Sequence, residues 1–499
     1  MSLLCIHTLP QSEHKMPSTL PIHTVNSVLT VLLTLLIIAL VICAIVRWTR
    51  TPSTQQPIPN APEHNNPFEN ASSASASIMD LMHRTTSIRF VDGRRSSFSS
   101  SSLSSSFSPS DSDSPTSSLY IIVRRPRMFD RIVSRGELGF CESYMDGDWD
   151  TPALEPLFSE LLAHEEDLQR ELHSQSLNMM WMYVQSVLTS TFTNRNHLER
   201  SSDNIISHYD VGNDLYTKML GPTMQYTCAY YAHPGITTLD HAQRTKMALI
   251  AHKLDLQPGM TVLDIGCGFG AMAYYLADVH GVSVVGVTLS PSQVELAHAQ
   301  FAHPRVDIRI QDYRDVEAEF GPAAFDRVYS IGMFEHVGHK NYNTYFDTCH
   351  RLLRPNGVML LHTIATRQRE WSHQNCINTY IFPGGELPHL QHLAELSAYD
   401  QWHLEDLHNF GRSYAKTLRA WRANLGDWEG LSPRKYPKRF RRMWDIYLHG
   451  CAAQFELRNI FLLQLVFTKQ GERKGEDDMG SRIRGFLGGE DKKTDEIRG

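Results

Sequence analysis

The sequence predicts an α/β fold with a mainly parallel sheet in residues 201–469. Short apolar runs of strand length recur through this part of the chain, at 261–265, 283–287, 307–310, 327–331 and 358–361. Amphipathic stretches with helical periodicity separate them, for example 271–279, 292–300 and 342–353. Strands that alternate with helices are typical of βαβ units, whose strands pair in parallel. Ligands of such sheets bind beyond the carboxyl ends of the strands, so we expect a site at that edge.

Composition narrows the class of protein. The chain has 499 residues, of which 41% are hydrophobic and 20% charged, enough for a core in more than one domain. Its formal net charge is -7, which argues against a general nucleic-acid binder. The eight cysteines form no C-x-x-C pair and no Cys/His cluster. This spacing argues against a disulfide framework or a metal site, and it favours a reducing compartment.

Residues 28–46 predict a transmembrane helix. They carry no charge, and at ~1.5 Å per residue such a helix spans roughly 30 Å, about one hydrocarbon core. Arg47, Trp48 and Arg50 follow it, as basic and aromatic residues do at a membrane interface. A secretory signal peptide is the alternative, but the apolar run begins late and no small-residue cleavage site follows it. The positive-inside rule then predicts a single-pass membrane protein whose large C-terminal part is cytosolic.

The rest of the chain divides by composition. Residues 1–27 precede the expected membrane helix. Residues 47–118 predict a disordered linker, because 15 of the 23 residues in 96–118 are serine. Residues 119–200 combine one strand-like run with helical patterning, which predicts a smaller mixed domain. Residues 470–499 are rich in glycine and in charges of both signs, which is typical of a disordered tail.

A glycine-rich loop follows the first strand of the sheet domain, with glycine at 266, 268 and 270. Glycines there let the backbone turn tightly and approach a ligand. Dinucleotide and S-adenosylmethionine sites both use such loops, and a purely structural turn is the plain alternative. Two details favour S-adenosylmethionine. Asp264 suits the ammonium of an amino acid, and the second strand ends at Thr288 without the acid that usually binds the ribose of NAD.

Several separated motifs make the chain similar to a known family. They lie at 136–147, 208–214, 224–230, 264–270, 285–290, 311–315, 332–338, 361–364 and 380–385. One reads MQYTCAY (224–230) and another reads GMFEHVG (332–338). Across most of 119–469, the chain resembles the cyclopropane-fatty-acyl-phospholipid synthases, which are S-adenosylmethionine-dependent methyltransferases.

The resemblance implies a Rossmann-like class I methyltransferase fold, preceded by a smaller lipid-associated domain at 119–200. The implied activity transfers a methylene from S-adenosylmethionine across the cis double bond of unsaturated acyl chains in phospholipids, forming cyclopropane fatty acids. The expected partner is unsaturated phospholipid in a membrane, not nucleic acid, and a homodimer is left open. The alternatives are a lipid C-methyltransferase giving a methyl-branched or methylene product, of sphingolipid or sterol type, a small-molecule N-methyltransferase, and a non-catalytic membrane scaffold.

The resemblance also assigns site residues. The implied reaction needs a base but no activated Ser or Cys, because the alkene is already the nucleophile. In the family the base is taken to be a bound bicarbonate, whose holders fall here on Cys228, Glu335, His362, the backbone of Ile364, and Tyr414. The cofactor contacts fall on Tyr226, Thr227, Asp264, Gly266, Cys267, Gly268, Thr288, Gln293, Tyr313 and Arg314. No metal is implied. Without the family, Cys228 also fits a small buried hydrophobe and Tyr414 fits plain packing.

The stretch 434–442 interleaves six cations with aromatic residues. Anionic headgroups attract such a stretch by ~1 kcal/mol per basic residue near the membrane surface. An ordinary basic helix face is the alternative interpretation.

Overall fold

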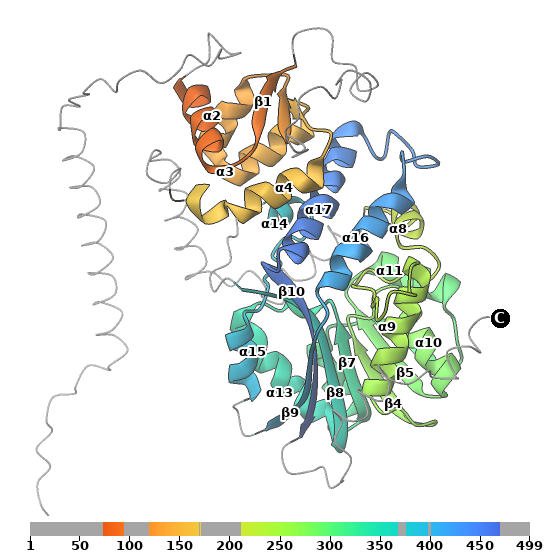
Figure 1. The fold of residues 1–499 in the computed structure, drawn as a ribbon. Coiled ribbons are helices and arrows are strands. Elements are labelled where there is room, and N and C mark those ends of the chain that lie inside the picture. The colour runs from red at the N-terminus through yellow and green to blue at the C-terminus, as the bar shows by residue number, and fades with distance from the viewer. Residues whose placement is uncertain are drawn as a thin grey trace, which may run out of the picture. The chain divides into compact units, whose positions relative to one another are not determined.

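The computed structural model describes residues 73–93, 119–168, 170, 211–367, 376–397 and 401–469, which lie within one compact unit, Pro67–Gly499 (Figure 1). The expected membrane helix at 28–46 and the expected tail at 470–499 fall outside these residues, as do the first three residues of the motif at 208–214. Within the described ranges, no helix is long and apolar enough to cross a bilayer.

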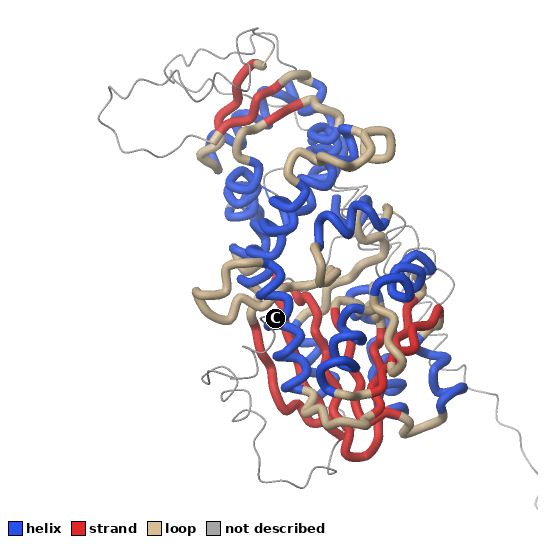
Figure 2. Tube along the Cα trace, turned by 90° about the vertical axis from the view of Figure 1, so that its right-hand side faces the viewer, coloured by secondary structure: helices blue, strands red, loops and turns tan. Residues whose placement is uncertain are grey.

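A seven-stranded sheet has the strand order β6-β5-β4-β7-β8-β10-β9 (Figures 1 and 2). Its five parallel strands are the five that the sequence predicts: β4 (Thr261–Ile265), β5 (Ser283–Thr288), β6 (Val306–Ile310), β7 (Phe325–Ile331) and β8 (Leu353–Thr366). Two antiparallel strands, β10 (Ile460–Lys469) and β9 (Trp402–Asn409), extend the sheet beyond β8. The predicted α/β fold with a mainly parallel sheet is confirmed, and the two antiparallel strands are an addition to it.

Helices cover both faces of this sheet, which is why its central strands are apolar almost throughout. One face carries three helices: α9 (Leu239–Lys253), α10 (Ala271–His280) and α11 (Pro291–Gln300). The other face carries α13 (Tyr342–Leu352) and α15 (Leu390–Ser397). Strand residues alternate between the two layers, so that Val262 packs with the first set of helices and Leu263 with the second.

A smaller α/β layer precedes the sheet in the chain. Its elements are α2 (Ser73–Thr85), β1 (Arg89–Asp92), β2 (Tyr120–Val123), α3 (Arg127–Met145), β3 (Trp149–Asp150) and α4 (Leu154–Ala163). Strand β1 pairs with β2 in parallel, and β3 pairs with β2 antiparallel.

Residues 73–93 are ordered, although they fall within the linker that the sequence predicts to be disordered. The composition of 47–118 predicts disorder, yet this segment forms α2 and β1. Ile78 and Leu81 recur at helical spacing and are buried, and α2 packs on α3. The serine run at 96–118 dominates the composition and hides the short amphipathic segment before it.

Two helices near the end of the chain join this layer to the sheet domain. α16 (Arg412–Leu425) and α17 (Lys438–Glu456) pack on each other, and α17 also packs on α3 and α4 (Figure 1). Arg442 fixes the contact: its guanidinium lies 3.7 Å from the Tyr144 ring centroid and donates to the carbonyls of Tyr144 and Trp149. One hydrophobic core therefore runs from α3 and α4 through α16 and α17 to α8 (Asn213–Leu220).

Most cations of the stretch 434–442 bind partners within the chain. Four of the six have partners within the chain: Lys435 pairs with Asp214, Arg439 with Asp146, Arg441 with the Tyr436 carbonyl and Arg442 with Asp150. Three of these four partners are carboxylates, and charges already neutralised by neighbouring acids attract a membrane only weakly. The structure therefore favours the helix-face interpretation of this stretch.

Candidate active site

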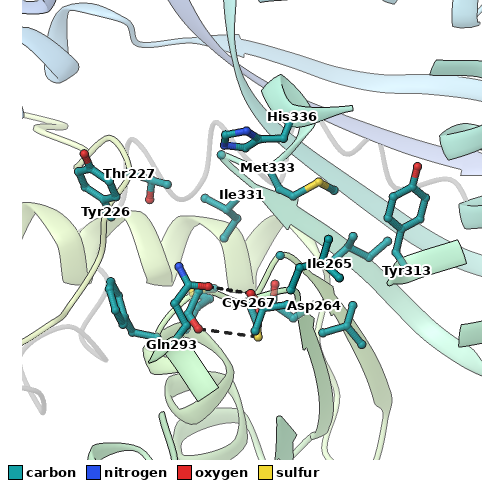
Figure 3. A pocket seen from close by; sticks show the side chains of 18 of the residues that line it. Tyr226, Thr227, Asp264, Ile265, Cys267, Gln293, Tyr313, Ile331, Met333 and His336 are labelled. Carbon is teal, nitrogen blue, oxygen red and sulfur yellow. Dashed lines mark hydrogen bonds between the residues drawn. The ribbon is translucent and has the colours of Figure 1, made fainter. Parts of the chain in front are cut away.

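A cavity lies at the carboxyl ends of β4, β5 and β7, the edge at which the fold predicts a ligand (Figure 3). It encloses about 1120 Å³, including the part open to solvent. All ten residues that the sequence assigns to the cofactor line it: Tyr226, Thr227, Asp264, Gly266, Cys267, Gly268, Thr288, Gln293, Tyr313 and Arg314. Segments far apart in the sequence thus meet in one place.

The glycine loop after β4 lines the cavity with backbone atoms. Gly266 has a φ of +79°, and a Cβ there would lie 2.6 Å from the Met333 side chain. Gly268 has a φ of +54°, with open space where a Cβ would stand. The amides of Gly266 and Cys267 donate to the Val287 carbonyl at 2.9 and 3.1 Å. These bonds tie the loop to β5, while the glycines allow its left-handed turns and its close approach to Met333.

Asp264 brings a buried carboxyl to the cavity. It is 2% exposed and accepts a hydrogen bond from the Tyr329 hydroxyl at 2.7 Å. Burial raises the pKa of Asp264 to about 7, and the Tyr329 hydrogen bond opposes that rise. A cation beside this carboxyl would favour its charged form, so Asp264 is suited to bind an ammonium group.

Two polar pairs form other parts of the wall. The Thr288 hydroxyl at the end of β5 donates to Gln293 Oε1 at 2.7 Å, and both side chains are buried. The Arg314 guanidinium donates to the Asp312 carboxylate at 2.8 and 2.6 Å. Asp312 therefore holds Arg314 in place, and it lines the cavity itself although the sequence analysis does not assign it to the site.

None of the five residues assigned to catalysis lines this cavity; they belong to a second, buried cluster that adjoins it. Chain neighbours connect the two. Thr227 lines the cavity while Cys228 is fully buried, and His336 lines the cavity while Glu335 faces the cluster. We call this second group of residues, Cys228, Glu335, His362, Ile364 and Tyr414, the buried cluster.

Glu335 and the end of β8 form one side of the buried cluster. Glu335 lies in the short helix Phe334–His336 after β7, and its Oε1 accepts a hydrogen bond from the Ile364 amide at 2.7 Å. Its second oxygen, Oε2, is buried and has no hydrogen-bond partner among the described residues. Burial raises the pKa of Glu335 to about 7, and the Ile364 hydrogen bond opposes that rise. The Ile364 amide is thus engaged by Glu335 and acts on the cluster by orienting that acid.

His362 lies two residues before Ile364 and opposite Ile331 of β7. It is 1% exposed, and its Nε2 has no hydrogen-bond partner in the described part of the chain. Burial lowers the pKa of His362 well below its ordinary value, and the nearby Lys246 and Lys253 lower it further. The ring is therefore neutral near neutral pH.

Cys228 and Tyr414 form the other side. The amide of Ala229 donates to the Thr417 hydroxyl at 3.0 Å, which brings the Cys228 loop to α16 one turn beyond Tyr414. Tyr414 stacks on Phe455 with ring centroids 4.4 Å apart. Burial raises the pKa of the Tyr414 hydroxyl, and the nearby Cys228 and Glu335 raise it further. That mutual influence places the two sides of the cluster close together.

Lys246 on α9 is a functional candidate that no sequence motif indicates. It is fully buried, and its ammonium donates to Gln225 Oε1 at 2.8 Å and to the Thr227 hydroxyl at 2.7 Å. Burial lowers its pKa to about 7, while the nearby Cys228 opposes that shift. Lysine on an amphipathic helix usually faces water, so no local sequence signal indicates this burial.

Other lining residues missed by the sequence analysis are mainly apolar, such as Met224, Phe269, Met272, Ile331 and Met333. Apolar side chains carry no motif, and only the folded chain shows which ones face the cavity. Gly332 is a further example: a Cβ there would lie 2.6 Å from Thr227, so glycine allows the two loops to meet.

The sheet is doubly wound, and its first strand leads into the glycine loop. The second strand ends at Thr288 instead of a ribose-binding acid. This arrangement is that of an S-adenosylmethionine-dependent methyltransferase. A family model described as mycolic acid cyclopropane synthetase matches residues 196–465. The cyclopropane-fatty-acyl-phospholipid synthase of Escherichia coli K12 is 41% identical over 350 residues, covering 70% of this chain and 87% of that protein. The chain belongs to the mycolic acid cyclopropane synthetase family.

Two further relatives extend the comparison. The tuberculostearic acid methyltransferase UfaA1 of Mycobacterium tuberculosis is 32% identical over 373 residues, covering 70% of this chain and 83% of that protein. The solved structure of the cyclopropane synthase MmaA2 from Mycobacterium tuberculosis matches with a TM-score of 0.50 at 33% identity. That match covers 53% of this chain and 97% of the MmaA2 chain.

Proposed function

We propose that this protein transfers a methylene from S-adenosylmethionine across the cis double bond of an unsaturated acyl chain in a phospholipid, forming a cyclopropane ring. The observation that carries the proposal is the buried cluster beside the cofactor cavity. There, Glu335 Oε2 and His362 Nε2 have no hydrogen-bond partner among the described residues. Ring closure requires a base that takes a proton from the transferred methyl group, and these groups are suited to hold one.

The cavity fits S-adenosylmethionine. Asp264 offers a carboxyl to the ammonium of its amino acid, and Thr288 with Gln293 offers neutral hydrogen-bonding groups to a ribose. Tyr313 and Arg314 line the part of the wall that we assign to the adenine. When bound, S-adenosylmethionine supplies an electrophilic methyl group on its sulfonium. The residues of this chain bind it, orient it and exclude water from it.

Aromatic side chains next to the cavity are suited to a substrate that becomes positively charged. The Tyr226 ring lies 5.2 Å from the Tyr216 ring and 5.3 Å from the Trp421 ring, measured between centroids. Aromatic faces attract cations without reacting with them. We therefore assign this side of the cavity to the acyl chain, whose double bond gains positive charge when it accepts the methyl group.

The buried cluster fits a small anion such as bicarbonate, which would act as the base. Lys246 places a buried ammonium beside the Cys228 loop, and its two hydrogen bonds go to neutral oxygens. A buried cation without a carboxylate partner is costly, and an anion nearby would offset that cost. The neutral His362 ring, the Tyr414 hydroxyl and a protonated Glu335 each bring a hydrogen to donate.

Cys228 is more suited to shaping this cluster than to attacking the methyl group. Burial raises the pKa of its thiol well above the ordinary value, and its hydrogen is directed to the Ala229 carbonyl at 3.2 Å. The thiolate is the nucleophilic form of cysteine, so a raised pKa argues against a methylated cysteine intermediate.

The experiment that tests the function uses purified protein, S-adenosylmethionine and vesicles of cis-unsaturated phospholipid. We expect the acyl chain to gain one CH₂ by mass spectrometry and upfield cyclopropane protons by NMR. A methyl-branched or methylene product would favour a second candidate, a lipid C-methyltransferase, which the similarity to UfaA1 supports. No lipid product despite bound cofactor would favour the scaffold alternative.

We also propose that the protein reaches its substrate as a single-pass membrane protein with a cytosolic catalytic domain. The apolar stretch at 28–46 and the cations after it support this. Protease digestion of sealed membrane vesicles tests the orientation. In vesicles whose cytosolic face points outward, we expect the protease to digest the catalytic domain. Light scattering on the detergent-purified protein would distinguish a monomer from the homodimer.

A further inference from the structure

A row of polar side chains crosses three strands beside the buried cluster. Gln464 on β10 lies directly opposite His362 on β8 and also opposite His408 on β9 in the strand register. Directly opposite residues share one face of a sheet, with Cβ atoms about 4.5–5.5 Å apart. The row therefore begins at the cluster and ends on the edge strand, with Gln464 at its centre.

Gln464 is the one described residue that hydrogen-bonds the His362 ring. Its Nε2 lies 3.1 Å from His362 Nδ1, and the two residues are 0% and 1% exposed. The Phe410 ring packs against the imidazole with centroids 5.8 Å apart. A buried ring held in this way has its orientation and its hydrogen bonding set by the protein.

In the structure the Gln464 amide turns its NH₂ to His362, while its Oε1 is buried without a hydrogen-bond partner among the described residues, and this orientation determines where the His362 proton resides. The NH₂ of an amide only donates, so the nitrogen that receives it must carry a lone pair. Nδ1 of His362 is then unprotonated, and a neutral imidazole carries its single proton on Nε2. Nε2 is the nitrogen that has no partner among the described residues.

We propose that Gln464 is a positioning residue, whose amide holds His362 in the tautomer that leaves Nε2–H as a donor for the anion of the buried cluster. This inference rests on the proposed function, because the bound anion is what gives the Nε2 proton its use. In the opposite tautomer, Nε2 presents a lone pair, which repels an anion. One neutral side chain thus decides whether the imidazole attracts or repels the base.

A neutral amide suits this task better than an acid does. A carboxylate at position 464 would accept a hydrogen bond from a protonated Nδ1. It would therefore favour the opposite tautomer or the imidazolium. Lys253 sits further along the row, where its ammonium pairs with Asp406 at 2.8 Å and lies 3.4 Å from His408 Nδ1. The Lys253 charge is therefore largely offset by Asp406 at the outer end of the row.

The direct test reads the tautomer in the full-length protein purified in detergent. Selective ¹⁵N-histidine labelling gives a signal for each ring nitrogen, and the His362 signals are those that disappear in His362→Gln. We expect Nδ1 to resonate as an unprotonated nitrogen and Nε2 as a protonated one. The Gln464→Met variant keeps the side-chain size but removes the amide donor, so we expect its His362 to become a mixture of tautomers.

Kinetics separate positioning from a structural role. For Gln464→Met we expect the KM for bicarbonate to rise and kcat to fall by about 10- to 100-fold, as for other partners that orient a histidine. Affinity for S-adenosylmethionine should be unchanged, since Gln464 does not line the cofactor cavity. The matched control is Thr468→Val, a buried polar-to-apolar change on the same strand, which removes the hydrogen bond to Glu405 and should leave tautomer and KM unchanged.

A wild-type His362 that is protonated on Nδ1 would overturn the proposal, whether or not the variant folds. An unchanged tautomer and KM in Gln464→Met would also overturn it. The tautomer of His362 is measured without lipid, so it tests the role of Gln464 independently of turnover. A protein that makes no cyclopropane product would refute the proposed function but would leave the measured tautomer unaffected.

Discussion

The carboxyl group of Glu335 accepts a hydrogen bond from the backbone amide of Ile364 at 2.7 Å. This bond joins the turn after β7 to the neighbouring strand β8, and it fixes one oxygen of a buried acid while the other has no described partner. The next residue, His336, lines the cofactor cavity. A titratable oxygen is thereby held immediately beside the cavity that we assign to S-adenosylmethionine.

Glu335→Gln should separate chemistry from cofactor binding. The amide keeps the shape and can still accept from Ile364, but it cannot hold or release a proton. We expect kcat to fall by about 10²- to 10³-fold, the usual cost of losing one preorganised polar group. Calorimetric titration should give an unchanged dissociation constant for S-adenosylmethionine. The control is Glu319→Gln, an exposed acid at the sheet edge that pairs with Arg309. Loss of cofactor binding in Glu335→Gln would contradict the separation of the two sites.

The same variant should change how stability depends on pH. The pKa of Glu335 is about 7 in the folded protein against an ordinary value of 4.5. Between these two values the folded state keeps a proton that the unfolded state has released, so the free energy of unfolding decreases as pH rises. The decrease amounts to at most about 3 kcal/mol and is complete above pH 7.

Thermal melting of wild type and Glu335→Gln from pH 4 to 8 measures this contribution. Asp264 also has its pKa raised to about 7, so only the difference between the two proteins isolates Glu335. We expect the variant to gain stability relative to wild type as pH rises. A difference that stays constant across the range would show that Glu335 is not protonated in the folded state.

Lys246→Met should weaken cofactor binding although the lysine does not line the cavity. The ammonium holds Gln225 and Thr227, and these residues form part of the cavity wall. Hydrogen bonds from a charged donor are worth about 1.5–3 kcal/mol, so we expect the dissociation constant for S-adenosylmethionine to rise by about 10-fold or more.

Lys253→Met is the matched control for that change, because it removes a buried lysine from the same helix. Lys253 pairs with Asp406, so its loss leaves an uncompensated acid and should lower stability by about 3 kcal/mol. Cofactor affinity should remain that of wild type. Equal loss of affinity in both variants would mean that the effect of Lys246→Met is a general loss of folding.

Truncation tests where the folded part begins. Deletion of 1–50 should preserve activity on detergent-dispersed lipid and abolish flotation with vesicles, because it removes the expected membrane helix. Deletion of 1–118 should in addition lower the melting temperature. It removes α2 and β1, with the buried Ile78, Leu81 and Phe90. Equal melting temperatures for the two truncations would contradict the packing of α2 on α3.

The sheet could be predicted where strands are buried on both faces. The runs that became β4, β5 and β7 are short, rich in β-branched and other apolar residues, and followed by glycine or a turn, so each stands out locally. Strand β9 does not stand out, because this edge strand reads WHLEDLHN and places the two acids Glu405 and Asp406 side by side at its centre. The helix α2 is likewise hidden, since a short amphipathic segment is masked by the serine run that follows it.

Most residues that the sequence assigns to the cofactor could be predicted to lie together, because they sit at or after the ends of the successive strands β4, β5 and β6. The roles of Lys246 and Gln464 could not be predicted, although the apolar run IFLLQLVF around Gln464 is consistent with a buried strand. Their roles depend on contacts with Thr227 and with His362, which are far away in the sequence. For Ile364, only the structure shows that its amide is engaged by Glu335.

The most direct test of the central claim is to count the deuterium atoms in the product formed from S-adenosylmethionine with a trideuterated methyl group. Vesicles of cis-unsaturated phospholipid serve as the acceptor, and mass spectrometry of the released fatty acids gives the count. If the buried cluster holds a base that removes one hydrogen from the transferred methyl group, the new ring carbon keeps two deuterium atoms. A product that keeps all three would show methyl transfer without ring closure and would contradict the account.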